Sequence, residues 1–237
     1  MESSTTRPGA AAPAAPEWTV LGLYAGQVRP MPGDGRPTGI FKRALDGRVR
    51  IGWEGIEGDV QADRRVHGGL EKALHHFPLE HHRRLARQFP QLAAQFGAGA
   101  IGENLATEGI DESGACIGDV YALGSARIQL NQPRSPCWKI DAKFGVEGIT
   151  RYIADHGMAG WYYRVLEPGE AAAGDRLRLL ERNAAPVTLA GLWGAMQEHR
   201  PQRETLRRIA ETPGLNAAWR LRLLRRADWL DGNAEHP

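Results

Sequence analysis

Hydrophobic and polar residues alternate over short stretches in the first three quarters of the chain, a pattern that is typical of β-strands. Clusters of glycine and proline separate these stretches, as turns would. The pattern predicts strands over residues 19–24, 48–53, 118–123, 126–131, 161–166 and 174–179. Two of them follow Gly-Asp turns, and strand pairs at such spacings suit a small, closed or nearly closed barrel. We therefore predict a mainly β body with helices, built around a barrel.

Other segments have the spacing of helices. Residues 78–89 and 147–156 carry apolar side chains three or four positions apart, and we expect both helices to pack on the outside of the barrel. Beyond residue 186, helical periods predict three short helices, a bundle of about 45 residues with a marginal core of its own. Thr188 and Asn216 stand where two of these helices begin, and both residue types cap helix N-termini.

These patterns divide the chain into three parts. Residues 1–16 are rich in Ser, Thr, Ala, Gly and Pro, and too poor in apolar surface to offset the entropy lost on ordering. We expect a disordered tail there, a barrel domain over residues 17–183, and a three-helix C-terminal domain over residues 186–232.

The composition supports a globular protein and gives no sign of a membrane-spanning or strongly basic nucleic-acid-binding protein. Hydrophobic residues make up 42% of the 237 residues, enough to fill a core, and 29 glycines agree with many tight turns. The formal net charge of only +2 indicates neither a nucleic acid nor a membrane surface as a partner. The chain has two cysteines, no secretory leader pattern and no apolar run of about 18 residues, so we expect a cytoplasmic protein with free thiols.

The charges of the C-terminal part are nearly balanced. Eight arginines between residues 186 and 237 face six acidic residues, which is too little net charge for a nucleic-acid module. We expect these helices to dock on the barrel, on a second copy of the chain in a homodimer, or on an electron donor.

One loop, NQPRSPCWKI at residues 131–140, holds a cysteine in a stiff and cationic setting. Pro136 directly precedes Cys137 and restricts the backbone there. Arg134 and Lys139 would favour the thiolate, the form that acts as a nucleophile or a soft metal ligand. A buried structural cysteine is the other interpretation, since free cysteines are often buried. The loop alone leaves both open.

Two glycine-containing segments are further candidates for a binding site. In GIEGDVQADRRVHGG, residues 55–69, the glycines would let backbone N–H groups approach an anionic or pterin-like ligand near His67. In IGENL, residues 101–105, Asn104 offers both a donor and an acceptor, although an ordinary Asn turn would look the same.

Histidines are frequent after the first of these segments, but their spacing disfavours zinc. His75 and His76 are separated from His81 and His82 by Pro78, which matches no familiar zinc pattern. We interpret His81 and His82 as solvated histidines on a helix.

Four motifs in the order GIEGDVQADRRVHGG, IGENLATEG, IGDVYALG and QPRSPCWKI resemble MOSC-domain proteins, specifically the YiiM-type group described as 6-N-hydroxylaminopurine resistance proteins. The resemblance extends from about residue 19 to residue 230, including the three-helix tail. It implies a β-barrel MOSC domain that binds the molybdenum cofactor, a molybdopterin with a terminal phosphate.

The same resemblance implies roles for individual residues. Cys137 matches the cysteine that ligates the molybdenum, and Cys116 has no matching role and is taken as structural. The residues expected to bind the cofactor are Lys42, His67, Asn104, Arg134, Ser135 and Cys137. Catalysis is assigned to Cys137, with Glu57 or His67 as proton donor. His67 is favoured because histidine titrates near neutral pH.

The implied reaction is the reduction of an N-hydroxylated substrate, R–NHOH, to R–NH₂ and water. Two cysteines cannot hold a four-cysteine iron–sulfur cluster, and flavin and haem motifs are absent, so a separate electron-donating reductase is implied. The alternative function is a non-catalytic carrier of the molybdenum cofactor or of sulfur, with a persulfide on Cys137.

Overall fold

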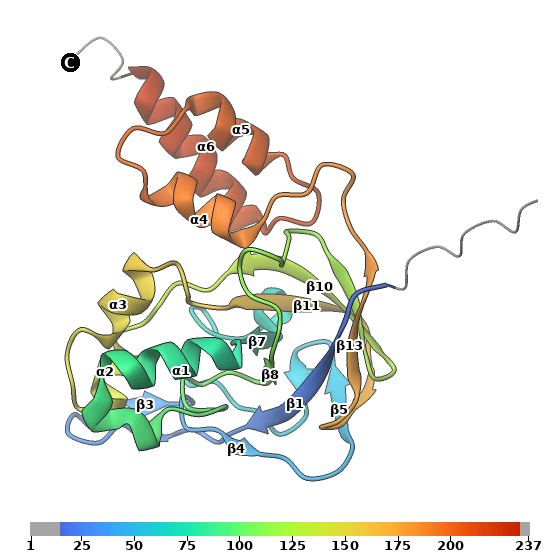
Figure 1. Cartoon of the computed structure of the whole chain (residues 1–237), viewed down its shortest axis with the longest axis vertical. Helices are drawn as coiled ribbons and strands as arrows, with labels where there is room; N and C mark the ends of the chain where they lie inside the picture. The colour runs from blue at the N-terminus through green and yellow to red at the C-terminus, as the bar shows by residue number, and fades with distance from the viewer. Residues whose placement is uncertain (1–14, 233–237) are drawn as a thin grey trace, which may run out of the picture.

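The computed structural model describes residues 15–232, and its centre is a closed barrel of seven strands (Figure 1). The predicted disordered tail falls almost entirely outside the described residues. β13 pairs with both β9 and β1, which closes the ring. The barrel strands are β1 (Glu17–Ala25), β7 (Leu74–His76), β8 (Leu105–Thr107), β9 (Val120–Leu123), β10 (Ala126–Pro133), β11 (Trp161–Glu167) and β13 (Arg176–Glu181). The predicted β-barrel is therefore confirmed.

Shorter elements extend the barrel. β4 (Arg43–Ala44) pairs with the end of β1, and β2 (Arg29–Pro30) pairs with β3 (Pro37–Thr38). A small sheet is formed by β5 (Val49–Gly52), β6 (Gly55–Ile56) and β12 (Gly169–Ala171). Two 3₁₀ helices, η1 (Leu70–Lys72) and η2 (Pro90–Gln95), complete the connections.

The helices form two groups. α1 (Leu79–Gln88), α2 (Lys139–Phe144) and α3 (Ile149–Asp155) cover one side of the barrel, as Figure 1 shows. α4 (Leu189–Gln197), α5 (Arg203–Ala210) and α6 (Ala217–Gly232) lie together at one end. Both predicted caps are confirmed, because the side chains of Thr188 and Asn216 accept hydrogen bonds from the first turns of α4 and α6. None of the helices in residues 15–232 is both long and apolar enough to cross a membrane.

One buried cluster runs from the barrel interior into the C-terminal helices. It joins barrel residues such as Tyr121 and Trp161 to Leu192 of α4 and Leu223 of α6. A second cluster joins Phe77, which follows β7, to Leu85 of α1, Ile140 of α2 and Ile153 of α3. The C-terminal helices therefore pack on the barrel, whereas the predicted domain boundary near residue 183 stays a prediction.

The prediction that His81 and His82 are solvated is wrong. Both side chains are buried, at 4% and 1% exposure, on the inner face of α1. His81 Nε2 lies 2.6 Å from a carboxylate oxygen of Glu112, and His82 Nε2 lies 2.7 Å from Glu103. These carboxylates make burial of the imidazoles possible, since a buried polar group needs a partner. Spacing along α1 alone could not show partners that come from other segments.

We expect the barrel to lose stability in acid because His76 is buried as a neutral imidazole. Burial, with a smaller effect of His81, lowers the pKa of His76 from 6.5 to about 3. Between these values the unfolded chain binds a proton that the folded chain does not. The free energy of unfolding should therefore fall by up to about 1.4 kcal/mol per pH unit below 6.5.

Urea unfolding of the wild type and of His76→Gln, at neutral pH and at about pH 4.5, measures this effect. The variant should lose about 2 kcal/mol less between the two conditions, because glutamine does not titrate. An equal loss in both proteins would contradict the assignment.

Candidate functional site

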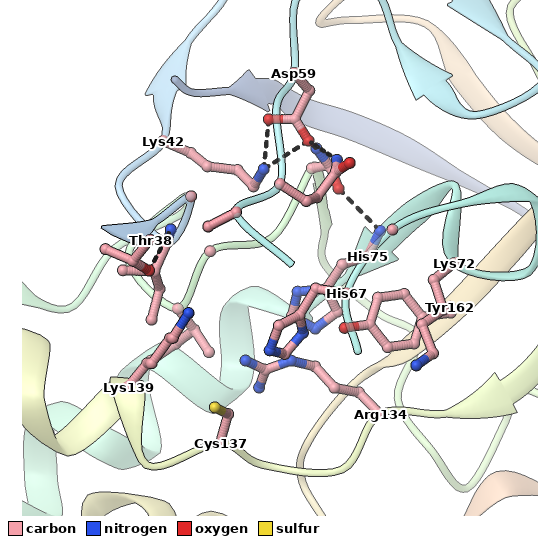
Figure 2. A pocket seen from close by; sticks show the side chains of 18 residues that line it. Thr38, Lys42, Asp59, His67, Lys72, His75, Arg134, Cys137, Lys139 and Tyr162 are labelled. Carbon is pink, nitrogen blue, oxygen red and sulfur yellow. Dashed lines mark hydrogen bonds and ion pairs between the residues drawn. The ribbon is translucent and has the colours of Figure 1, made fainter. Parts of the chain in front are cut away.

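A cavity that is open to solvent brings together most of the motifs singled out in the sequence (Figure 2). The lining comes from residues 38–42, 59–62, 67–72, 101–104 and 134–139, with His75 of β7 and Tyr162 of β11. Segments far apart in the sequence therefore meet at one place beside the barrel.

The cysteine loop is held from several sides. β10 ends at Pro133, and the backbone N–H of Arg134 then donates to the Gly160 carbonyl at 3.0 Å. The Cys137 carbonyl accepts from the Ile140 N–H at 2.9 Å and from the Thr150 hydroxyl at 3.2 Å. Figure 2 shows the half-buried Cys137 side chain beside the cavity, between Lys139 and Arg134. The thiol is thus held in place rather than carried on a free arm.

Three cations around the cavity lack a carboxylate partner. Arg134 is only 4% exposed, and its buried Nη1 has no hydrogen-bond partner among the described residues. The Lys72 ammonium donates to the Val66 carbonyl and the Lys139 ammonium to the Pro37 carbonyl. Within the described part of the chain, no carboxylate oxygen lies within ion-pair distance of these three side chains. A buried guanidinium with a free donor indicates an anionic ligand.

These cations also act on His67. Burial first, and then the charges of Arg134 and Lys139, lower the pKa of His67 to about 4. The imidazole of the protein without ligand is therefore neutral at neutral pH. The sequence-based expectation that His67 titrates near neutrality does not hold for the cavity in this state.

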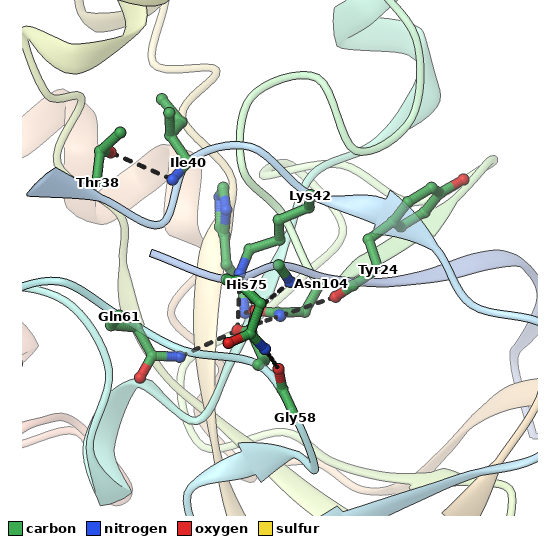
Figure 3. A network of polar contacts seen from close by, with 11 residues as sticks. Tyr24, Thr38, Ile40, Lys42, Gly58, Gln61, His75 and Asn104 are labelled. Atoms are coloured by element: carbon green, nitrogen blue, oxygen red, sulfur yellow. Dashed lines mark hydrogen bonds and ion pairs between the residues drawn. The ribbon is translucent and has the colours of Figure 1, made fainter. Parts of the chain in front are cut away.

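On the opposite wall, Lys42, Gln61 and Asn104 belong to a network of polar contacts (Figure 3) around the buried carboxylate of Asp59, which Figure 2 labels. Asp59 accepts from Lys42 Nζ at 2.5 and 2.7 Å and from Asn104 Nδ2 at 2.9 Å. Asn104 also donates to the Tyr24 carbonyl, and its Oδ1 accepts from the backbone N–H of His75. Lys42 and Asn104 therefore line the cavity as predicted, but their polar groups are already engaged within the protein.

Two predicted site residues do not line the cavity. The Glu57 side chain is 62% exposed and forms an ion pair with Arg50 on the surface. Ser135 is exposed and is not among the residues that line the cavity. Neither is placed to contact a ligand in the cavity.

Sequence patterns missed several lining residues, among them His75, Tyr162 and Lys72. His75 is fully enclosed in β7, and burial, together with the charge of Arg134, lowers its pKa well below the ordinary value. Tyr162 lies in β11 and Lys72 in η1, both facing the cavity (Figure 2). The alternation of residues along β11 could have shown which face of the strand carries Tyr162. It could not have shown which cavity that face lines.

The donor set fits an anionic organic cofactor that carries its own metal ligands. No group of three or more His, Cys, Asp and Glu side chains within residues 15–232 could hold a metal ion by itself. Cys137 offers one soft ligand, and the free donor of Arg134 offers an anion contact. A metal at this place would need further ligands from a bound molecule.

Comparison with known proteins agrees with the fold and with the motifs. The family model described as MOSC domain matches residues 63–178. The chain is 38% identical over 198 residues to Protein YiiM of Escherichia coli (strain K12), covering 83% of this chain and 87% of that protein. It is 34% identical over 173 residues to a protein of Gibberella moniliformis named Reductase, a match that spans 72% of this chain and 31% of that one.

A solved structure supports the same relationship. The crystal structure of YiiM from Escherichia coli superposes with a TM-score of 0.73 and 32% sequence identity, covering 91% of this chain and 94% of that chain. The structural similarity to that protein therefore extends over the C-terminal helices as well as the barrel. The chain belongs to the MOSC family, as one of its YiiM-type members.

Proposed function

We propose that the protein is a molybdenum-cofactor-dependent oxidoreductase that reduces N-hydroxylated compounds, such as 6-N-hydroxylaminopurine, to the corresponding amines. One observation carries the proposal: a held thiol and a buried guanidinium with a free donor lie at the same cationic cavity. The MOSC family and the relative named Reductase support the same class of activity.

The residues of the cavity suit the parts of molybdopterin. The Cys137 thiolate would be the protein ligand to the molybdenum. Arg134, Lys72 and Lys139 would face the anionic groups of the cofactor, including its phosphate, and Arg134 is best suited to a bidentate contact. When bound, the cofactor would supply the two electrons of the reduction.

The reaction R–NHOH + 2e⁻ + 2H⁺ → R–NH₂ + H₂O also needs two protons. His67 is a titratable group of the cavity whose pKa an anionic ligand would change. Its pKa is lowered in part by Arg134, Lys139 and Lys72, and negative charge on a ligand would offset these cations. With the cofactor bound, His67 would therefore hold a proton nearer to neutral pH and donate it to the departing hydroxyl group. Glu57, at the surface, has no part in this scheme.

The electrons must reach the cavity from outside. The chain has two cysteines, of which Cys116 is buried away from the cavity. A separate reductase is therefore part of the proposal.

Replacing Cys137 with alanine should abolish the retention of molybdenum, because the metal would lose its protein ligand. The measurement is the molybdenum and pterin content of the wild type and Cys137→Ala, both produced in a host that makes the cofactor. Cys116→Ala removes the other thiol and should keep the metal. Full retention in Cys137→Ala would contradict the proposal. A wild-type protein without molybdenum, but with an extra sulfur on Cys137 by mass spectrometry, would favour the carrier function instead.

The loaded protein should reduce 6-N-hydroxylaminopurine to adenine when a chemical reductant replaces the electron donor. Chromatography of the products measures this, with Cys137→Ala as the inactive control. A protein that contains molybdenum but forms no amine from this or other hydroxylamines would contradict the assigned reaction and leave the cofactor assignment intact.

Replacing Arg134 with glutamine should weaken cofactor binding by about 10- to 100-fold, because a charge-assisted hydrogen bond is lost in a buried place. Cofactor retained through gel filtration, measured as pterin per chain, reports the loss. Arg127→Gln removes an arginine that pairs with Glu167 and Glu181 on the outside of the barrel, and it should retain the cofactor as the wild type does. Equal retention in both variants would exclude the role given to Arg134.

A further inference from the structure

Besides Asp59, a second carboxylate, that of Glu71, makes contacts that connect the C-terminal helices to the loops of the cavity. Glu71 lies in η1, next to the cavity residue Lys72. A single oxygen, Oε2, accepts from Arg164 Nη2 at 2.7 Å, from Asn216 Nδ2 at 2.9 Å and from Asn131 Nδ2 at 3.1 Å. Asn216 is the cap of α6, so one of these donors comes from the C-terminal helices.

The backbone of Glu71 is held as well. Its carbonyl oxygen accepts from the side chains of Asn131 and Gln132, each at 2.8 Å. The backbone N–H of Asn216 in turn donates to the Asn131 carbonyl at 2.9 Å. Asn131, Gln132 and Asn216 are all buried, at 0%, 3% and 8% exposure. Three segments of the chain are therefore fixed to one another at this point.

Two of these segments lead directly into the cavity. η1 follows the glycine loop with His67 and Gly68, and its own Lys72 lines the cavity. Asn131 and Gln132 are in the last part of β10, which continues into Arg134 and Cys137. A displacement at Glu71 would thus move the anion-binding side chains of both loops.

Glu71 is ionised in this arrangement. Burial alone would raise its pKa, but the hydrogen bonds from Asn216, Arg164 and Asn131 outweigh this effect, and the pKa is lowered. A carboxylate that accepts from three donors holds them more strongly than a neutral acceptor would.

We propose that Glu71 and Asn216 are positioning residues, through which the docked C-terminal helices set the relative position of the glycine loop and the cysteine loop. The inference rests on the proposed function only in taking the cavity between these loops as the reaction site. It gives the helical tail a role in the geometry of the cavity, beyond packing on the barrel.

Asn216→Asp separates this link from helix capping. Aspartate caps a helix as well as asparagine does, so the hydrogen bond to the Ala218 N–H is kept. The donor to Glu71 is lost, and two carboxylates then face each other. Adding Glu71→Gln removes the repulsion between the two carboxylates, because the glutamine side chain is neutral and its oxygen can still accept from Arg164.

Two readouts on the metal-free full-length protein report on the loops. Amide hydrogen exchange of residues 67–73 should become about tenfold faster in Asn216→Asp, since the lost bond involves a charged acceptor. The alkylation rate of Cys137 by iodoacetamide should also change, and the variant with both substitutions should return toward the wild type in both readouts. Cys137→Ala gives the background from Cys116.

Thr188→Ala is the matched control, because it removes the cap of α4 and loosens the same helical unit without touching Glu71. It should leave residues 67–73 and Cys137 unchanged. The proposal is overturned if Thr188→Ala produces the same changes, or if Asn216→Asp leaves both readouts at the wild-type level. Neither readout needs molybdenum or turnover, so failure here is distinguishable from failure of the proposed reaction.

Discussion

The buried carboxylate of Asp59 is the constraint on which one wall of the cavity depends. Its side chain is only 2% exposed, and an unpaired charge at such a place would cost several kcal/mol. The required donors come from segments far apart in the sequence: Gly26, Lys42, Gln61 and Asn104. Asn104 adds Tyr24 of β1 and His75 of β7 to the same network. Hydrogen bonds within the protein therefore hold this wall together without a ligand.

This arrangement also decides the charge of the cavity. Asp59 neutralises Lys42, the cation nearest to it, and leaves Arg134, Lys72 and Lys139 uncompensated at the other side. The charge of the cavity is therefore unevenly distributed. One wall is hydrogen-bonded and has no net charge, and the other wall is cationic and carries the thiol. Burial lowers the pKa of His67 most, and the cations of the second wall lower it further. An anionic ligand would bind against the cations and change the protonation of His67 in the same event.

The longer features could be predicted from the sequence, whereas partners contributed by distant segments could not. Strands of six or more predicted residues, such as β1 and β10, have enough alternation to be recognised. β7 and β8 have only three residues each and are buried on both faces, so neither shows alternation. Within GIEGD, the sequence offers Glu57 and Asp59 as equivalent acids. Only the donors brought by Lys42 and Asn104 decide that Asp59 turns inward while Glu57 stays at the surface.

The two carboxylates that organise the cavity differ in their access to water. The Asp59 side chain is almost inaccessible to water, so its hydrogen-bond donors must come from the protein. Glu71 performs the same task for the other wall, yet its side chain is 46% exposed. Water can therefore replace a lost partner of Glu71 at a modest cost, so we expect the barrel to stay folded when the contact with Asn216 is removed. If Glu71 and Asn216 act as we propose, the wall that carries the thiol and the cations is the one whose geometry would respond to the C-terminal helices.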